Sequence, residues 1–347
     1  TGEIVSESTF ASDVKLVIKF IETLKSRYEN DVEIKCGYEA GCLGYSLYKS
    51  LTARGVDCVI LAPTTMQVSA KNKMVKNDRM DALNIAKNLA SGSYKSVYVP
   101  DEEDVEIKEY IRMIHDFKKE LKRVKQEICA FVLRHGYQYD GKSKWTIRYM
   151  NWIRELEMSE IQRETLNEYI AEMENLNDKI NRFMNRIDEM YQSERYHEKV
   201  SKLRCFKGIE TFAAMTIQVE TADFERFPSA KAYASYTGLT TGEHSSGDKN
   251  NRIGITKQGN TVIRKTLVEC AQSLVKGNVY AKKSQGLKSR QKGMDVNIIA
   301  YADKATERLK KKYQKLIERN VPRNKAIVAV ARELACFIWG METGNIH

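Results

Sequence analysis

Residues 32–61, VEIKCGYEAGCLGYSLYKSLTARGVDCVIL, carry the pattern that decides the fold. Apolar residues alternate at the start of 32–39 as in a strand, and the compact apolar run at 56–61 is typical of a buried parallel strand. Between them, residues 43–54 have helical spacing, and Gly55 is a suitable helix stop. Strand, helix and strand in this order predict an α/β domain with a largely parallel sheet.

The same alternation of types extends over the first hundred residues. Residues 13–28 have apolar side chains at helical spacing, with Ser12 as the expected N-cap, and residues 78–90 are a further expected helix before a short strand at 97–99. The opening letters, TGEIVSES, are typical of the end of a hairpin, so we expect more chain upstream. We therefore predict an α/β domain over residues 1–100.

The pattern changes between residues 101 and 200, where there is no proline and few glycines. Apolar residues recur at three- and four-residue spacing, and one series keeps this spacing for about three heptads: Leu166, Ile170, Met173, Leu176, Ile180, Phe183 and Ile187. This predicts a helical coiled-coil arm or helical hairpin over 101–200, with its turn at 137–143. Such a stripe is core or dimer seam, so we assign it no chemistry.

Residues 201–347 are a third expected unit, which is mostly helical. The expected helices are 203–219, in two parts around Lys207 and Gly208, then 230–238, 261–276, 296–318 and 323–339. A polar loop, TTGEHSSGDKNNRIGITKQGN, occupies residues 240–260, and a basic stretch lies at 282–292.

Composition limits the class of protein. The 347 residues include Lys+Arg 57 and Asp+Glu 46, a formal net charge of +11 that favours polyanionic partners. With only 4 Pro and 19 Gly, a sandwich of short strands is excluded as the main architecture. The cysteines form no C-x-x-C pair, so we expect neither a zinc site nor a disulfide framework. No apolar run approaches the roughly 20 residues that cross a bilayer, so we expect a cytoplasmic protein without a membrane partner.

Three acidic residues are candidates for a metal site. Asp78 and Asp81 are three apart at the expected start of a helix, a spacing that puts both carboxylates on one face, where they can bind one hard cation. Glu39 follows an expected parallel strand, and open α/β sheets place their sites beyond such strand ends. Two divalent ions bound by such carboxylates would stabilise the attacking and leaving oxygens of phosphoryl transfer. Taken alone, each acid is more often a solvated charge or an acid that caps a helix.

The polar loop has the residue types of a nucleophilic site. Ser246 stands directly before a glycine. Cations that could stabilise a pentavalent phosphorus follow it: Lys249, Arg252, Lys257, Arg264 and Lys265. The alternative is a solvated turn whose cations contact phosphates without chemistry, and composition alone favours that alternative.

Three further basic groups could contact nucleic-acid phosphates. The first consists of Lys282, Lys283, Lys288, Arg290 and Lys292. The second, on the expected arm, consists of Lys118, Lys119, Lys122, Arg123 and Lys125. The third, on a late helix, consists of Arg308, Lys310, Lys311, Lys312 and Lys315, with Tyr301 and Tyr313 nearby for stacking. A solvated helix face is the alternative, and the residues do not say which group meets RNA and which meets DNA.

Three motifs resemble the IS110 family of bacterial insertion sequences, a group that includes the site-specific invertase Piv. They are Y-E-A-G around Glu39, K-N-D-R-M-D-A at 76–82, and A-S-Y-T-G-L-T…H-S-S-G…R-I-G-I-T-K-Q-G-N…I-R-K-T-L at 234–267. The resemblance runs in order over essentially the whole chain. It implies a RuvC-like (RNase H-like) DEDD domain, then the coiled-coil arm, then a mostly α serine transposase domain.

The resemblance also implies roles for single residues. Glu39, Asp78 and Asp81 would be three of four acids that bind Mg²⁺, and Ser246 would be the nucleophile that forms a covalent phosphoserine link to DNA. Family members act as tetramers, guided by a bridge RNA from their own element, with the carboxylates of one subunit next to the serine domain of another. The implied activity is RNA-guided recombination of donor and target DNA.

Two positions depart from the family pattern. The first acid, an Asp normally found in a G-[IV]-D-type stretch on the opening strand, is missing, and Asp13 does not replace it because it begins the first helix. We expect this Asp upstream of Thr1. Glu210 replaces the second glycine of the family's Pro-Gly-Ile-Gly hairpin, which argues against a DNA-backbone contact at 206–210.

Two other functions stay open. A RuvC-like, metal-dependent structure-specific endonuclease would use the same acids but would hydrolyse DNA with water, leaving no protein–DNA adduct. A non-catalytic RNA- and DNA-binding scaffold would need only the arm and the basic surfaces, and the missing first Asp favours it.

Overall fold

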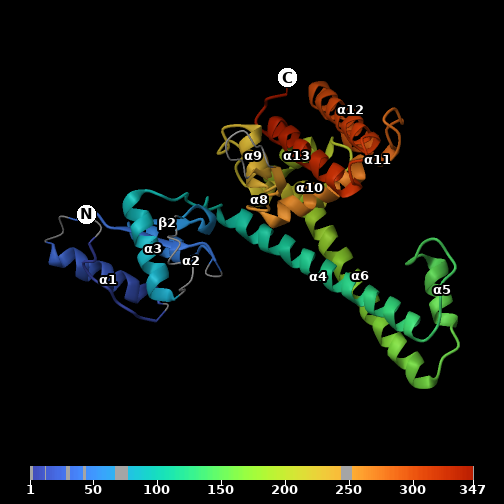
Figure 1. Cartoon of the computed structure of the whole chain (residues 1–347), viewed down its shortest axis with the longest axis horizontal. Helices are drawn as coiled ribbons and strands as arrows, with labels where there is room; N and C mark the ends of the chain where they lie inside the picture. The colour runs from blue at the N-terminus through green and yellow to red at the C-terminus, as the bar shows by residue number, and fades with distance from the viewer. Residues whose placement is uncertain are drawn as a thin grey trace. The chain divides into compact units, whose positions relative to one another are not determined.

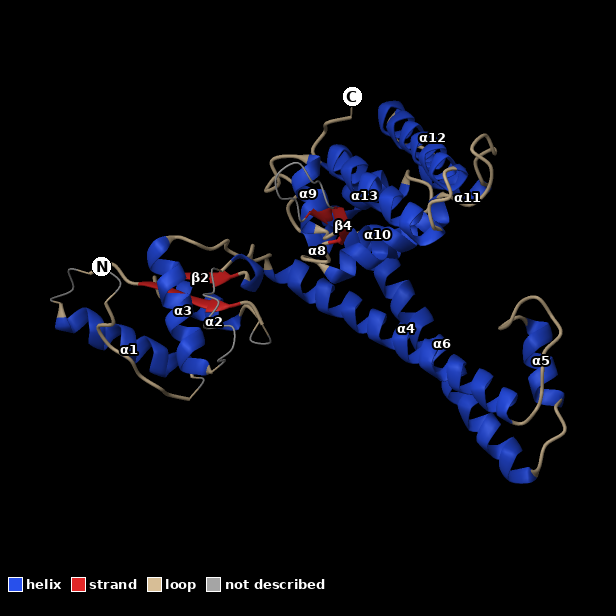
Figure 2. Ribbon diagram, in the orientation of Figure 1, coloured by secondary structure: helices blue, strands red, loops and turns tan. Residues whose placement is uncertain are grey.

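The computed structural model describes residues 3–11, 13–28, 32–41, 44–66, 77–243 and 252–346. The chain divides into two compact units, Thr1–Pro100 and Asp101–His347. Most described residues are helical (Figure 2), and no helix among them is both long and apolar enough to cross a bilayer.

The first unit is built on a small parallel sheet. Its elements are α1 (Val14–Arg27), β1 (Lys35–Glu39), α2 (Ser46–Thr52), β2 (Asp57–Leu61), a 3₁₀ turn η1 (Pro63–Thr65) and α3 (Asp78–Ser91). β1 and β2 pair in parallel with Glu39 opposite Leu61, which confirms the strand–helix–strand prediction. The predicted strand at 97–99 is wrong, because the segment makes only an isolated bridge, from Ser96 to Leu61, before Pro100, which has no N–H to extend a ladder.

The N-terminus of α1 differs from the sequence prediction. The N-cap is Asp13, whereas the expected Ser12 lies outside the described residues; the Asp13 carboxylate accepts a hydrogen bond of 2.9 Å from the N–H of Lys15. α1 buries Ile21 against Leu51 of α2, so a single apolar cluster holds both helices together on one side of the sheet.

Two long helices form the arm of the second unit. They are α4 (Glu102–Arg134) and α6 (Glu160–Tyr191), which lie side by side (Figure 1). They are antiparallel, because the ring of Phe117 contacts Phe183 whereas Phe131, further along α4, contacts Tyr169. The two are joined through an unpredicted third helix, α5 (Ile147–Glu155), at the end of the arm.

The apolar series of α6 divides between two clusters. Leu166, Ile170, Met173 and Leu176 are buried at the end of the arm, and Ile187 belongs to the larger core of the unit. The stripe is therefore packing surface over the length of the helix, as its composition predicts.

The remaining elements surround that larger core. They are α7 (Glu194–Arg204), α8 (Thr211–Thr221), α9 (Ala230–Tyr236), β3 (Thr241–Glu243), β4 (Arg252–Ile255), α10 (Thr261–Leu274), α11 (Gln285–Gln291), α12 (Val296–Glu318) and α13 (Arg323–Glu342). α8 lies at the centre, with every residue from Ala214 to Thr221 buried. α11 lies in the basic stretch at 282–292, where the sequence predicts no helix; Ser284 begins the helix as an N-cap.

Two chain segments cross closely where the β3–β4 hairpin meets α9. The N–H of Asn260 donates to the carbonyl of Tyr236 (3.2 Å), and the N–H of Lys257 donates to that of Gly238 (3.2 Å). Gly259 has φ +108°, and a Cβ there would lie 2.0 Å from the Tyr236 carbonyl oxygen. The glycine of the K-Q-G-N motif is thus required by both its backbone angle and the space available.

We expect Gly259→Ala to lower the free energy of unfolding by about 3 kcal/mol, because it adds backbone strain to a steric clash. Chemical denaturation of the full chain, followed by far-UV circular dichroism, measures the change. Gly254→Ala is the matched control, since nothing lies within 4 Å of a Cβ at that position. Equal stability of the two variants would contradict this account of the crossing.

Candidate functional site

The structure places Glu39 at the carboxyl end of β1, with an exposed side chain. Pairing continues one residue further, because the N–H of Ala40 donates to the carbonyl of Leu61 (3.0 Å). α3 packs across the strand at Gly37, where an added Cβ would lie 2.7 Å from Leu61 Cδ1 and 3.0 Å from Leu89 Cδ1. The sheet edge and α3 therefore give Glu39 a rigid backbone.

Asp78 and Asp81 lie in the first turn of α3. Asn77 caps this helix, its side chain accepting a hydrogen bond of 2.9 Å from the N–H of Met80, so neither aspartate has the capping role. Both carboxylates are favoured there by the positive end of the helix dipole. Beside Asp78 a cavity of about 760 Å³ lies between α3 and the N-terminal segment Glu3–Phe10.

These acids fit a metal ion in donor type, because Mg²⁺ prefers carboxylate oxygens. Within the described ranges, however, no three His, Cys, Asp or Glu side chains lie close enough together to bind a metal ion. Glu39 is not brought to the Asp78–Asp81 pair to complete a three-ligand set. A metal site at these residues stays a prediction.

The serine segment is framed by an antiparallel pair of strands. Thr241 of β3 lies opposite Ile255 of β4, and Glu243 lies opposite Arg252. Ser246 and Lys249 lie outside the described residues, and of Arg252 only the backbone is described. The pairing brings the two ends of the segment that carries Ser246 side by side.

A buried carboxylate connects this region to the arm. Glu220, near the end of α8, has a fully buried side chain, and Arg112 of α4 donates to it at 2.7 and 3.0 Å. The ammonium of Lys108 lies 3.5 Å away. The side-chain amide of Asn260 donates to the same carboxylate at 2.7 Å. The oxygen of that amide caps α10 by accepting hydrogen bonds from the N–H groups of residues 262 and 263. Glu220 thus joins α8, α4 and the start of α10.

Burial by itself would raise the pKa of Glu220. The hydrogen bonds and charges of Arg112 and Lys108, with the Asn260 amide, outweigh burial and hold that pKa below its ordinary value. Glu220 is not among the candidate residues predicted from the sequence. The available signal is an acid near the end of the otherwise apolar stretch FAAMTIQVE, where a carboxylate is buried only if it has partners.

The cations that follow the hairpin differ in how exposed they are and in which groups of the protein they contact. Lys257 is exposed, and Lys265 is exposed with its ammonium 3.9 Å from Glu269. Arg264 is half-buried and donates to the Thr237 carbonyl (3.3 Å) and the Thr261 hydroxyl (3.2 Å). Lys257 and Lys265 therefore offer charge to a ligand, whereas Arg264 also stabilises the crossing of the two chain segments.

The basic stretch at 282–292 divides in the same way. Lys283 donates to Asp303 and to Gln291, and Arg290 donates to the carbonyl of Arg204 (3.0 Å). These two cations hold α11 on the unit, and Lys282, Lys288 and Lys292 are the exposed members of the group.

On α12 most of the basic group is engaged within the protein. Arg308 and Lys312 both donate to Glu333 at 2.6 Å, and the buried Lys310 donates to a backbone carbonyl at 2.6 Å. The predicted stacking role of Tyr301 is wrong, because its ring lies in the core and is 8% exposed. Helical spacing alone does not determine which face of α12 the rest of the unit covers.

Comparisons with known proteins agree with each other. A DEDD-type transposase family model matches residues 1–136, and the model described as "Transposase IS116/IS110/IS902 family" matches residues 200–285. A putative transposase of Sinorhizobium fredii is 33% identical over 310 residues, 88% of this chain and 74% of the relative. The transposase for insertion sequence element IS1533 of Leptospira borgpetersenii is 30% identical over 320 residues, 90% of each chain.

We expect Glu220→Gln to cost about 2 kcal/mol of stability, because Lys108, whose side chain is 12% exposed, and the half-exposed Arg112 lose the negative charge that they pair with. Glu225→Gln, an exposed neutralisation five residues away, should change stability by less than about 0.5 kcal/mol. Thermal and chemical denaturation of both variants measure the difference.

The pH dependence has a defined sign. Because the folded-state pKa of Glu220 is lowered, its contribution to stability is present above the ordinary pKa of 4.5 and is lost as pH falls through the lowered value. The stability gap between wild type and Glu220→Gln should therefore shrink below about pH 4.5. A gap that is constant with pH would mean that the charge of Glu220 contributes nothing.

Proposed function

Because the chain belongs to the IS116/IS110/IS902 family of transposases, we propose that it recombines donor and target DNA under the guidance of a bridge RNA from its own element. As an insertion-sequence transposase it acts on DNA strands. The observation that supports a serine nucleophile is the pairing of β3 with β4. This pairing places the two ends of the Ser246 segment side by side, and exposed cations follow it in the chain.

The proposed chemistry is a transfer of a phosphoryl group to serine and back. Ser246 Oγ attacks the scissile phosphorus, an Oγ–P bond forms, and the P–O bond to the leaving DNA strand breaks. The serine proton passes to a base and the leaving oxygen takes up a proton. A hydroxyl of the exchanged strand then attacks the phosphoserine and releases Ser246. One diester is exchanged for another, so no external energy source is required.

Cations near the hairpin would stabilise the charge that develops on phosphorus. Lys249 and Arg252 flank the serine segment in sequence, and Lys257 and Lys265 follow it as exposed side chains. Lys282, Lys288 and Lys292 offer a further exposed surface for DNA phosphates.

The acidic residues would bind the metal ion that stabilises the attacking and leaving oxygens. In this proposal Asp78 and Asp81, with Glu39 and a fourth acid, an Asp, would hold Mg²⁺, which would supply electrophilic stabilisation of the phosphate oxygens. The donor types support this, and the first-turn position of the aspartates projects both from one helix. We further propose that the chain acts as a tetramer in which these acids and Ser246 come from different subunits.

Ser246→Ala should abolish the covalent protein–DNA adduct and lower strand exchange by about 10³-fold or more, because the nucleophile is removed. Binding of DNA and RNA should persist. The measurement is a denaturing gel for the adduct together with a plasmid recombination assay, and Ser245→Ala is the matched control. An adduct in Ser246→Ala would exclude this serine; cleavage by the wild type without any adduct would favour the water-using endonuclease.

Asp81→Asn should lower cleavage by at least about ten-fold and raise the Mg²⁺ concentration needed for half-maximal rate, because a ligand oxygen loses its charge. Titration of cleavage rate with Mg²⁺ measures both. Glu22→Gln, which neutralises an exposed acid on α1, is the control. An unchanged Mg²⁺ dependence in Asp81→Asn would remove this residue from the proposal.

A further inference from the structure

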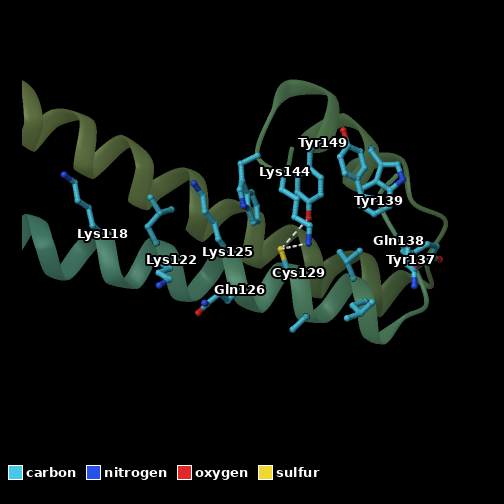
Figure 3. A pocket seen from close by; sticks show the side chains of 16 residues that line it. Lys118, Lys122, Lys125, Gln126, Cys129, Tyr137, Gln138, Tyr139, Lys144 and Tyr149 are labelled. Atoms are coloured by element: carbon cyan, nitrogen blue, oxygen red, sulfur yellow. Dashed lines mark hydrogen bonds between the residues drawn. The ribbon is translucent and has the colours of Figure 1, made fainter. Parts of the chain in front are cut away.

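The end of the arm holds a pocket of about 800 Å³ that the proposed chemistry does not use. One wall is α4, and the other is the segment that leads into and through α5, residues 137–152. Figure 3 shows Lys118, Lys122 and Lys125 spaced along α4, with Tyr139, Lys144 and Tyr149 on the facing segment. The pocket lies within one compact unit of the chain.

Aromatic rings form the facing wall. The ring of Tyr139 lies 5.0 Å, centroid to centroid, from both Tyr149 and Trp152, and that of Trp145 lies 5.1 Å from Tyr149. Tyr149 is 1% exposed and supports the others from behind. Tyr139, Trp145 and Trp152 are only half-buried, so they present ring surface to the pocket.

The charge of the pocket has a single sign. Four lysines line it, and no Asp or Glu is among the lining residues. The ammonium of Lys125 lies 5.3 Å from the centre of the Trp145 ring, and that of Lys144 lies 3.6 Å from the Cys129 sulfur. The ammonium of Lys118 lies over the Phe212 ring (3.7 Å), which leaves Lys122, Lys125 and Lys144 as the cations of the pocket.

The backbone of Trp145 is in the left-handed region, with φ +66°. A bulky L residue rarely adopts this conformation, because it costs free energy, and such outliers cluster at ligand sites. Here the conformation accompanies an indole that lies beside Lys125 at the pocket.

We propose that this pocket binds an unpaired stretch of RNA, about two or three nucleotides long, with its bases stacked on the half-buried rings and its phosphates next to the three lysines. A wall of rings with cations and no carboxylates is complementary to a single-stranded polyanion. Bases of duplex DNA must be flipped out at a cost before they can stack in such a pocket, whereas RNA loops present them unpaired. The inference rests on the RNA part of the proposed function and extends it to named residues.

The test uses the full chain and a fluorescein-labelled twelve-nucleotide oligouridine, with oligothymidine and duplex RNA of equal length as comparisons. Fluorescence anisotropy should show tightest binding to the oligouridine. Trp145→Ala should weaken that binding about ten-fold, because it removes one stacking surface. The double variant Lys125→Gln and Lys144→Gln should reduce the magnitude of the slope of log affinity against log salt by about 1.4, because each of these lysines neutralises about one phosphate of a single strand.

A matched control separates the pocket from the general charge of the arm. Lys119→Gln with Lys142→Gln removes the same charge from exposed arm residues that do not line the pocket, and it should leave affinity within about two-fold. The lysine variants keep the rings in place, so they test the proposal even if Trp145→Ala does not fold. Equal effects of the two lysine pairs, or preference for oligothymidine or duplex, would overturn it.

The result is distinguishable from failure of the recombination proposal. Ser246→Ala should bind the oligouridine as the wild type does, and a pocket variant should retain the covalent adduct on DNA when the guide RNA is supplied far in excess of its weakened affinity. Loss of the adduct with intact oligouridine binding would count against the serine chemistry alone. Loss of pocket-dependent binding with an intact adduct would count against the pocket alone.

Discussion

The carboxylate of Glu220 is the interaction on which the second unit depends. A charge that is wholly removed from water is tolerated only with partners, and here the partners come from α4 and from the cap of α10. Because Asn260 both binds Glu220 and begins α10, the outgoing end of the hairpin is fixed to the base of the arm. The scaffold for the serine segment and the scaffold for the arm are therefore one body.

The arm separates the pocket from the Glu220 cluster by the length of a helix. From Arg112, at the Glu220 cluster, to Lys125, a cation of the pocket, α4 advances about 20 Å along one continuous helix. Pairing with α6 keeps this length straight, and α5 closes its end with aromatic residues. A stretch of RNA bound at the arm end would thus be kept away from the hairpin of the same unit, and would not compete there with DNA phosphates for the exposed lysines.

Much of the local structure could be predicted because its cause is local. The parallel pairing of β1 and β2 follows from apolar runs separated by a helix, and α12 begins and ends where its apolar spacing does. Two predictions differ from the structure because of one neighbouring residue each. Asp13 caps α1 in place of the expected Ser12, and Pro100 ends the segment in which a strand was expected at 97–99. α5 and α11 were missed because short helices depend more on caps such as Thr146 and Ser284 than on periodicity.

The sequence by itself determined the candidate chemistry: the acids Glu39, Asp78 and Asp81, Ser246 and its cations, and a family pattern that the comparisons confirm. Only the tertiary structure decided which cations are available, because Lys283, Arg290 and Lys310 are engaged by groups far away in the sequence. The tertiary structure also placed the lysines of α4 opposite the rings of Tyr139, Trp145 and Trp152. Burial and pairing depend on which surfaces meet, and no spacing along the chain contains that information.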